Sequence, residues 1–179
     1  MSEFVFRTAT QDDVASLQPF VHAAYRGDSA RRGWTHEADL LDGQRIDDLA
    51  LSAMIDAPDH VILIAEQQGE LVGCVQINGK GNGLAYLGML SVDPERQGGG
   101  IGRRLIKAAE AEAHSTFKAT RMEMTVIVQR TELITWYARC GYQPTGETRP
   151  FPATDPRFGL PKRDDLAFVV LARDLTPQA

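Results

Sequence analysis

The sequence predicts one mixed α/β domain over residues 1–179, with antiparallel pairing in its first half and crossover connections in its second half. A chain of 179 residues suits a single domain. In the first half, two apolar runs flank Gln-Gln-Gly-Glu at residues 67–70, a pattern typical of a β-hairpin. In the second half, stretches with helical spacing alternate with stretches of strand-like alternation, which predicts crossovers.

The first half opens with a short strand and a capped helix. Residues 4–7 predict the strand. Asp12 or Asp13 can cap the helix, because a short acidic side chain accepts hydrogen bonds from the free N–H groups of a first turn. Its apolar face carries Val14, Leu17, Val21 and Tyr25. A second helix is predicted over residues 37–55, with a break near 42–43. Further strands are predicted at residues 61–66, 71–77 and 84–92.

The second half alternates helices with strands. Helices are predicted at residues 100–116 and 131–139, and Gly141 is well placed to end the second one. Strands are predicted at residues 122–128, 142–148 and 166–171. The connection over residues 149–163 carries four prolines and is longer than an ordinary loop, so we expect it to form a wall of a site.

Charge and composition exclude several classes of function. The formal net charge is −5, and an acidic surface repels a phosphate backbone, so no nucleic-acid partner is expected. No apolar stretch approaches the ~20 residues needed to span a bilayer, so no membrane partner is expected. The two cysteines lack CxxC spacing and suit a reducing compartment, and no signal peptide is visible. The prediction is therefore a cytoplasmic protein with no metal site.

The most informative segment is the glycine-rich turn after the strand at 84–92. Pro94 ends that strand, and a helix begins among Gly98, Gly99, Gly100 and Gly102. A glycine turn lets backbone N–H groups converge, and a helix N-terminus adds free donors, which together suit a pyrophosphate. The spacing fits neither the dinucleotide template G-x-G-x-x-G nor the Walker A loop. It fits Q/R-x-x-G-x-G/A, beginning at Gln97; a turn without a ligand is the alternative.

At this segment the sequence resembles the GNAT N-acetyltransferase superfamily. The match rests on Val-Asp-Pro-Glu at residues 92–95 and on Ile101-Gly102. The resemblance implies a central mixed, mostly antiparallel sheet of six to seven strands, flanked by about four helices. It also implies acetyl-CoA as cosubstrate, with the loop on its pyrophosphate and the preceding strand on its pantetheine. The implied binding residues are Leu90, Ser91, Val92, Gln97, Gly98, Gly99, Gly100, Ile101, Gly102 and Arg103.

A second match lies at residues 136–142, which resemble the family's aromatic-Tyr-x-x-x-Gly-aromatic helix end. The resemblance makes Tyr137 the candidate general acid for the departing CoA thiolate; packing beside Trp136 is the alternative. Many family members have asparagine seven residues before this tyrosine, where this chain has Arg130. Arg130 either contacts CoA or substrate, or faces water.

The acceptor site is less well defined by the sequence. Glu123 is the candidate general base, on the more polar face of its strand; a cross-strand salt bridge is the alternative. Trp34 and Phe151 are the candidate acceptor-binding residues, because they belong to the variable segments 26–37 and 149–163. Packing inside an ordered loop is the alternative for Trp34. Cys140, beside Gly141, is interpreted as a buried helix end with no catalytic role.

The sequence therefore predicts an N-acetyltransferase that moves an acetyl group from acetyl-CoA to a small-molecule amine, by direct transfer in a ternary complex. A catalytically silent acyl-CoA-binding or sensor module is one alternative, and a protein N-terminal or lysine acetyltransferase is another. A transferase with a nucleotide donor would need a different phosphate loop. A homodimer is compatible with these readings.

Overall fold

A computed structural model describes residues 3–25, 41–42, 46–151, 160–162 and 164–175. Its main sheet has seven strands in the order β1-β3-β4-β5-β6-β9-β7, and all neighbours are antiparallel except β5 and β6. The mostly antiparallel mixed sheet of the predicted fold class is confirmed. The strands are β1 (Phe4–Thr8), β3 (His60–Gln67), β4 (Glu70–Gly81), β5 (Leu84–Val92), β6 (Arg121–Ile127), β7 (Gln143–Pro150) and β9 (Ala167–Asp174).

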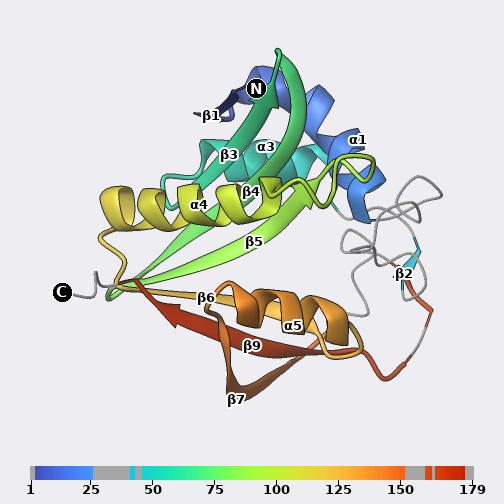
Figure 1. The fold of residues 1–179 in the computed structure, drawn as a ribbon, viewed down its shortest axis with the longest axis vertical. Coiled ribbons are helices and arrows are strands. Elements are labelled where there is room, and N and C mark those ends of the chain that lie inside the picture. The colour runs from blue at the N-terminus through green and yellow to red at the C-terminus, as the bar shows by residue number, and fades with distance from the viewer. Residues whose placement is uncertain (1–2, 26–40, 43–45, 152–159, 163, 176–179) are drawn as a thin grey trace.

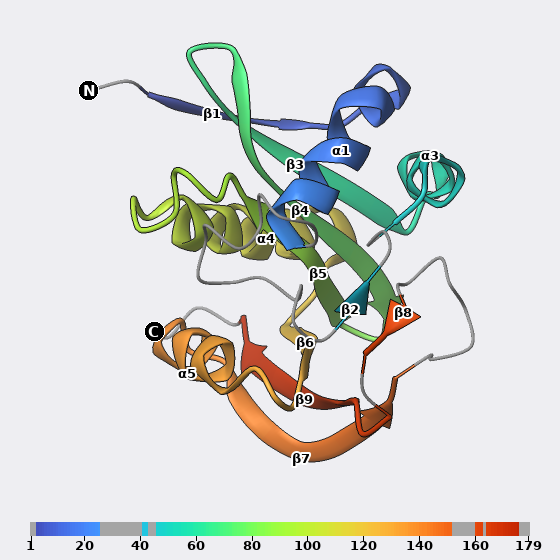
Figure 2. The same cartoon turned by 90° about the vertical axis from the view of Figure 1, so that its right-hand side faces the viewer.

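Helices cover both faces of the sheet. Within the described residues they are the 3-10 turn η1 (Gln11–Asp13), α1 (Val14–Tyr25), α3 (Asp48–Asp56), α4 (Ile101–Phe117) and α5 (Thr131–Arg139). In Figures 1 and 2, α1 and α3 cover one face of the first four strands and α4 covers the other. One core cluster joins α4 and α5 to the sheet, and a second joins α1 and α3 to it. No helix in the described part is long and apolar enough to cross a membrane.

Strands β5 and β6 separate after a short parallel contact. Only Leu84–Tyr86 of β5 pair with Arg121–Glu123 of β6. Beyond these pairs the two strands diverge, so the sheet opens like a V between α4 and α5 (Figure 1). Backbone polar groups on that edge of β5, from Leu87 onward, have no partner on β6. Exposed edge groups of this kind are ready to pair with another extended chain.

A β-bulge lies in β5 next to this opening. The pairing register with β4 shifts between Cys74 and Gln76, and Met89 has φ of 52° in the left-handed region. An extra residue in one strand reverses which face each later side chain occupies. Leu87 packs in the α4 cluster, whereas Met89 packs in the α1–α3 cluster. The bulge therefore returns Leu90 and Val92 to the α4 side, where they pack against that cluster.

The predicted second helix differs from the observed structure. Leu41–Asp42 form β2, a two-residue strand paired with β8 (Leu160–Pro161), so the helical prediction is wrong at Leu41, whereas Asp42 lies in the predicted break. Helix α3 begins only at Asp48, where the Asp47 carboxylate accepts a hydrogen bond from the Ala50 N–H at 2.7 Å. Its buried residue is Leu51, whereas Leu49 is 80% exposed. Pairing with a distant segment overrode local helical spacing.

Candidate active site

Three backbone features shape the loop that enters α4. Gly98 and Gly100 have φ of 93° and 83°, and a Cβ on either would meet no atom within 4 Å. Glycine is required there by backbone conformation and not by crowding. At Gly102 the reason is a close approach, because a Cβ would lie 3.1 Å from Cη2 of Trp136. The loop therefore lies directly against the indole of α5.

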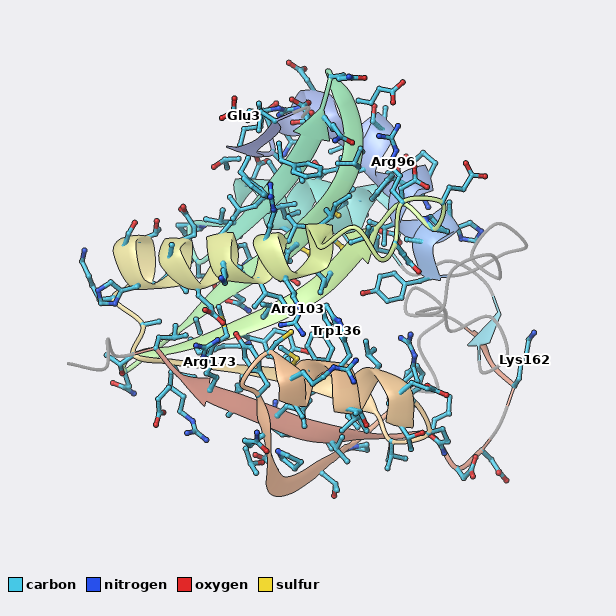
Figure 3. The ribbon with its side chains drawn as sticks, viewed as in Figure 1. Glu3, Arg96, Arg103, Trp136, Lys162 and Arg173 are labelled. Atoms are coloured by element: carbon cyan, nitrogen blue, oxygen red, sulfur yellow. The ribbon has the colours of Figure 1, made fainter. Side chains whose placement is uncertain are left out.

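Ionic contacts fix the start of the same loop to the β3–β4 hairpin. The Arg96 guanidinium donates to Glu70 at 2.7 Å and to Gln67 at 2.9 Å. It also lies 3.5 Å from the Asp93 carboxylate, whose other oxygen accepts from the Glu95 N–H at 3.0 Å. Figure 3 shows Arg96 beside this loop. The loop is thus held at its base while its glycines turn toward α4.

A first cavity of about 180 Å³ lies between this loop and α5. Two of its side chains, Arg103 from α4 and Trp136 from α5, lie between these helices in Figure 3. Among the described lining residues there are two arginines and no carboxylate. The first cavity therefore suits an anion. Its lining is Tyr25, Leu90, Val92, Gln97, Gly98, Gly100, Ile101, Gly102, Arg103, Arg130, Leu133, Trp136 and Tyr137.

A second cavity of about 290 Å³ adjoins the first at Tyr137. Aliphatic, sulfur-containing and aromatic side chains form most of its wall, and no carboxylate is found among its described lining residues. The two cavities share Tyr25, Leu90, Arg130, Leu133 and Tyr137. The rest of its lining is Ile46, Met54, Gln76, Tyr86, Leu87, Gly88, Met89, Met124, Thr125, Val126, Ile127, Phe151 and Phe168.

Tyr137 stands at the junction of the two cavities. It is 6% exposed, and its ring packs edge-on against Trp136 and Tyr142, with centroids 5.0 and 6.4 Å away. Burial raises the pKa of its phenol well above 10, and the nearby Tyr25 adds to this effect. A phenol in these surroundings stays protonated at neutral pH and can donate a proton.

Tyr25 fixes the β5 bulge from the end of α1. Its hydroxyl donates a hydrogen bond to the carbonyl oxygen of Leu90, the residue after Met89. On the other side of the bulge, the Ser91 hydroxyl donates to the Met89 carbonyl at 3.1 Å. These bonds hold the backbone of β5 in place where the two cavities meet. Sequence reasoning placed Tyr25 on an apolar face and missed this role, because Tyr25 and Leu90 are 65 residues apart in the sequence.

The structure brings together most of the predicted acetyl-CoA residues. Eight of the ten line the first cavity: Leu90, Val92, Gln97, Gly98, Gly100, Ile101, Gly102 and Arg103. Ser91 and Gly99 are not among its lining residues; Ser91 is 2% exposed and points into the bulge. Arg130, the departure from the family pattern, is 6% exposed and lines both cavities.

The predicted acceptor residues are placed less uniformly. Phe151 lines the second cavity beside Phe168, with ring centroids 5.3 Å apart. Trp34 lies outside the described residues. The Glu123 carboxylate accepts from Arg149 at 3.0 Å and is 14% exposed. It is not among the described residues that line either cavity.

Both cysteines are free thiols, Cys74 being buried and Cys140 half-buried. Burial raises the pKa of Cys74 to about 12 and also raises that of Cys140. Neither cysteine lines either cavity. In the described part of the chain, no group of three or more His, Cys, Asp or Glu side chains could hold a metal ion.

Comparison with known proteins identifies the family. Residues 20–142 match the family model described as Acetyltransferase (GNAT) family. The chain belongs to the GNAT acetyltransferase family. A curated relative, the IAA acetyltransferase of Azospirillum brasilense, is 32% identical over 96 residues, which are 52% of this chain and 61% of the relative. The match thus spans about three fifths of that relative's length.

Solved GNAT structures share the fold over nearly the whole chain. yncA, a putative acetyltransferase from Salmonella typhimurium solved with its cofactor acetyl-CoA, has a TM-score of 0.71 and 19% identity, covering 99% of this chain and 97% of that one. The spermidine/spermine N-acetyltransferase SpeG of Vibrio cholerae, solved in complex with manganese ions, has a TM-score of 0.67 and 15% identity, covering 97% of this chain and 94% of that one. The Escherichia coli ribosomal-protein-S18-alanine N-acetyltransferase has a TM-score of 0.71 and 13% identity, covering 99% of this chain and 97% of that one. The names of the last two proteins give different acceptors, so the shared fold leaves the acceptor of this GNAT chain open.

Proposed function

We propose that this GNAT protein transfers an acetyl group from acetyl-CoA to the amine of a small molecule, directly, in a ternary complex. The observation that carries the proposal is the junction of the two cavities at Tyr137 and Leu90. One cavity is lined by arginines and a glycine loop, and the other is mainly apolar. Two substrates, one in each cavity, would meet at this junction, and neither cysteine lines a cavity where it could form an acyl-enzyme.

The first cavity fits acetyl-CoA by two kinds of contact. The N-terminus of α4 offers free backbone N–H groups to a pyrophosphate, and Arg103 adds positive charge beside them. The β5 edge near Leu90 and Val92 is unpaired with β6, so it can pair with the two amides of a pantetheine arm. The trajectory from loop to strand leads the thioester to the junction.

Tyr137 is the proposed general acid. Its phenol is protonated at neutral pH because burial disfavours the phenolate. A proton donated to the departing sulfur makes CoA a better leaving group. The bulge at Met89 and Leu90 is the proposed source of a backbone N–H that polarises the thioester carbonyl.

The ammonium proton of the acceptor is proposed to leave through water and not by direct contact with a base. Because Glu123 pairs with Arg149 and is not found on either cavity wall, direct contact with the amine is not the role we propose for it. Glu123 is two residues before Thr125, which does line the second cavity. We therefore propose that the ammonium proton leaves through water past Thr125, with Glu123 as its acceptor.

Free-thiol release from acetyl-CoA across a broad panel of small amines tests the proposal. We expect turnover with at least one small amine, and loss of that turnover in Tyr137→Phe with acetyl-CoA affinity retained. Acetyl-CoA binding without thiol release from any amine would instead indicate a silent binder. Acetylation of intact proteins, with no small amine accepted, would assign the chain to the protein acetyltransferases.

A further inference from the structure

A buried glutamine in β4 lies in the wall of the second cavity. Gln76 is 7% exposed and pairs with Gly88 of β5. It interrupts a run of buried apolar residues in that strand. Among the described residues, none forms a hydrogen bond with its side-chain amide. Its amide is open to the second cavity, where a polar ligand can supply the hydrogen bonds that the described protein residues do not.

Gly88 leaves room beside that amide. A Cβ on Gly88 would lie 2.9 Å from the Gln76 Oε1 atom and 3.1 Å from Cε1 of Tyr86. Any side chain at residue 88 would therefore cover the amide. Gly88 itself lines the second cavity, so the gap opens toward the acceptor.

The neighbouring polar groups in this cavity are already engaged. Tyr86 and Thr125 share a hydrogen bond of 2.6 Å, and the Tyr25 hydroxyl donates to Leu90. Tyr137 is assigned to the leaving group. Arg130 lines both cavities and is a cation that suits the anionic cosubstrate, so Gln76 is the neutral polar side chain left among the described lining residues to recognise the acceptor.

We infer that Gln76 determines acceptor specificity by hydrogen bonding a neutral polar group at the far end of an apolar amine. This inference rests on the proposed function, because it places the amine at the junction beside Leu90. Gly88 precedes Leu90 by two residues, and the bulge at Met89 shortens the regular strand rise of ~3.3 Å per residue, so the polar group lies within about 7 Å of the amine. A second ammonium is not expected there, because the described lining offers no carboxylate to pair with it.

Matched pairs of amines test the inference. The pairs are tyramine with 2-phenylethylamine, and the hydroxyalkylamines from 3-amino-1-propanol to 6-amino-1-hexanol with the corresponding n-alkylamines. A site that hydrogen bonds a hydroxyl rejects the analogue lacking it, so we expect a kcat/KM ratio of roughly 10 or more in at least one pair. In Gln76→Leu that ratio should fall to about 1, through loss of turnover of the hydroxylated amine. Acetyl-CoA affinity should stay unchanged.

Control variants separate recognition from packing. Asn78→Leu, on the same face of β4, removes a buried amide oxygen that has no partner and lies outside both cavities. It should leave the ratio intact. Gln76→Met provides a second apolar replacement if Gln76→Leu does not fold. The kcat/KM ratio of the wild-type protein within each amine pair tests the inference even without either variant.

The outcomes also separate this inference from the proposed function. Equal kcat/KM within every pair, or a preference for spermidine over all neutral hydroxylated amines, overturns the role of Gln76 while leaving acetyl transfer in place. If no amine is acetylated, thermal shifts of the acetyl-CoA complex decide. A shift with hydroxylated amines that disappears in Gln76→Leu supports the inference and refutes catalysis, and no shift with any pair refutes both.

Discussion

Replacing Tyr137 with phenylalanine removes one hydroxyl and keeps the ring. The ring contacts to Trp136 and Tyr142, at 5.0 and 6.4 Å, do not involve the hydroxyl. Stability should therefore change by less than about 0.5 kcal/mol, as for substitutions that leave packing intact. Loss of one positioned acid typically lowers kcat by ~10²-fold or more. Two decades correspond to about 2.7 kcal/mol of transition-state free energy, far more than the change in folding.

The assay is thiol release at saturating acetyl-CoA and acceptor, with a pre-steady-state burst measurement to show that chemistry limits the rate. Tyr142→Phe is the matched control, because Tyr142 is a buried tyrosine whose hydroxyl donates to Glu110 at 2.9 Å and which lines neither cavity. It should lower stability by about 1–3 kcal/mol and leave kcat unchanged.

The pH profile adds an independent check. Burial raises the pKa of Tyr137 well above 10, so the acid remains protonated across the assay range. The rate should rise as the acceptor amine loses its proton and then stay level to pH 10, with no alkaline decline. An unchanged kcat in Tyr137→Phe under chemistry-limited conditions, or equal losses in Tyr142→Phe, would refute the acid role and return Tyr137 to packing.

Four further results are expected. Gly100→Val, at φ of 83°, should raise the acetyl-CoA dissociation constant more than threefold and lower stability by about 1–2 kcal/mol, measured by isothermal titration and urea unfolding; an affinity change below threefold contradicts the loop assignment. Arg7 holds the pKa of the Asp13 carboxyl down from 3.8 to about 2, so this pair contributes stability that is complete above about pH 4 and is lost as pH falls toward 2. Since Arg7 is 39% exposed, Arg7→Met should remove only about 1 kcal/mol of unfolding free energy at pH 7, and less as pH falls through 2, where the Asp13 carboxyl is half protonated. Phe151→Ala should raise acceptor KM several-fold with acetyl-CoA affinity unchanged, and equal effects on both substrates would remove Phe151 from the acceptor site. Glu123→Gln should lower kcat most below the amine's pKa, and a uniform loss at all pH values would leave Glu123 only its ion pair.

Sequence patterns predicted the helices and strands better than they predicted which element each one packs against. Helical spacing placed Leu17 and Val21 in the core, and both are fully buried. In α3, Leu51 is buried and Leu49 is 80% exposed, because the packing of α3 against β3 decides which side of the helix is inward. Local periodicity carries no information about that neighbour.

The site was predicted as far as backbone conformation and a tyrosine spacing could define it. Alternation along residues 84–92 could not reveal the bulge at Met89, which decides that Leu90 rather than Ser91 lines the first cavity. Gln76 was missed, although a polar residue inside an apolar run was the signal that could have found it. The exposure of the Gln76 amide to the cavity depends on Gly88, which pairs with it. A single sequence does not reveal which residues of two strands are paired.

The position of β9 between β6 and β7 has a consequence for the order of folding. Strands β3, β4 and β5 form two consecutive hairpins, so their contacts form between residues close in the chain. In contrast, β6 and β7 do not pair with each other. Both pair with β9, which is synthesised after them. As the chain emerges from the ribosome, the lobe bearing the glycine loop can assemble early, whereas the sheet beneath Tyr137 is complete only when residues 167–174 have been made. A ribosome stalled before that strand would display a half-built sheet with two unpaired edges, and this nascent species is the form of the protein most exposed to aggregation.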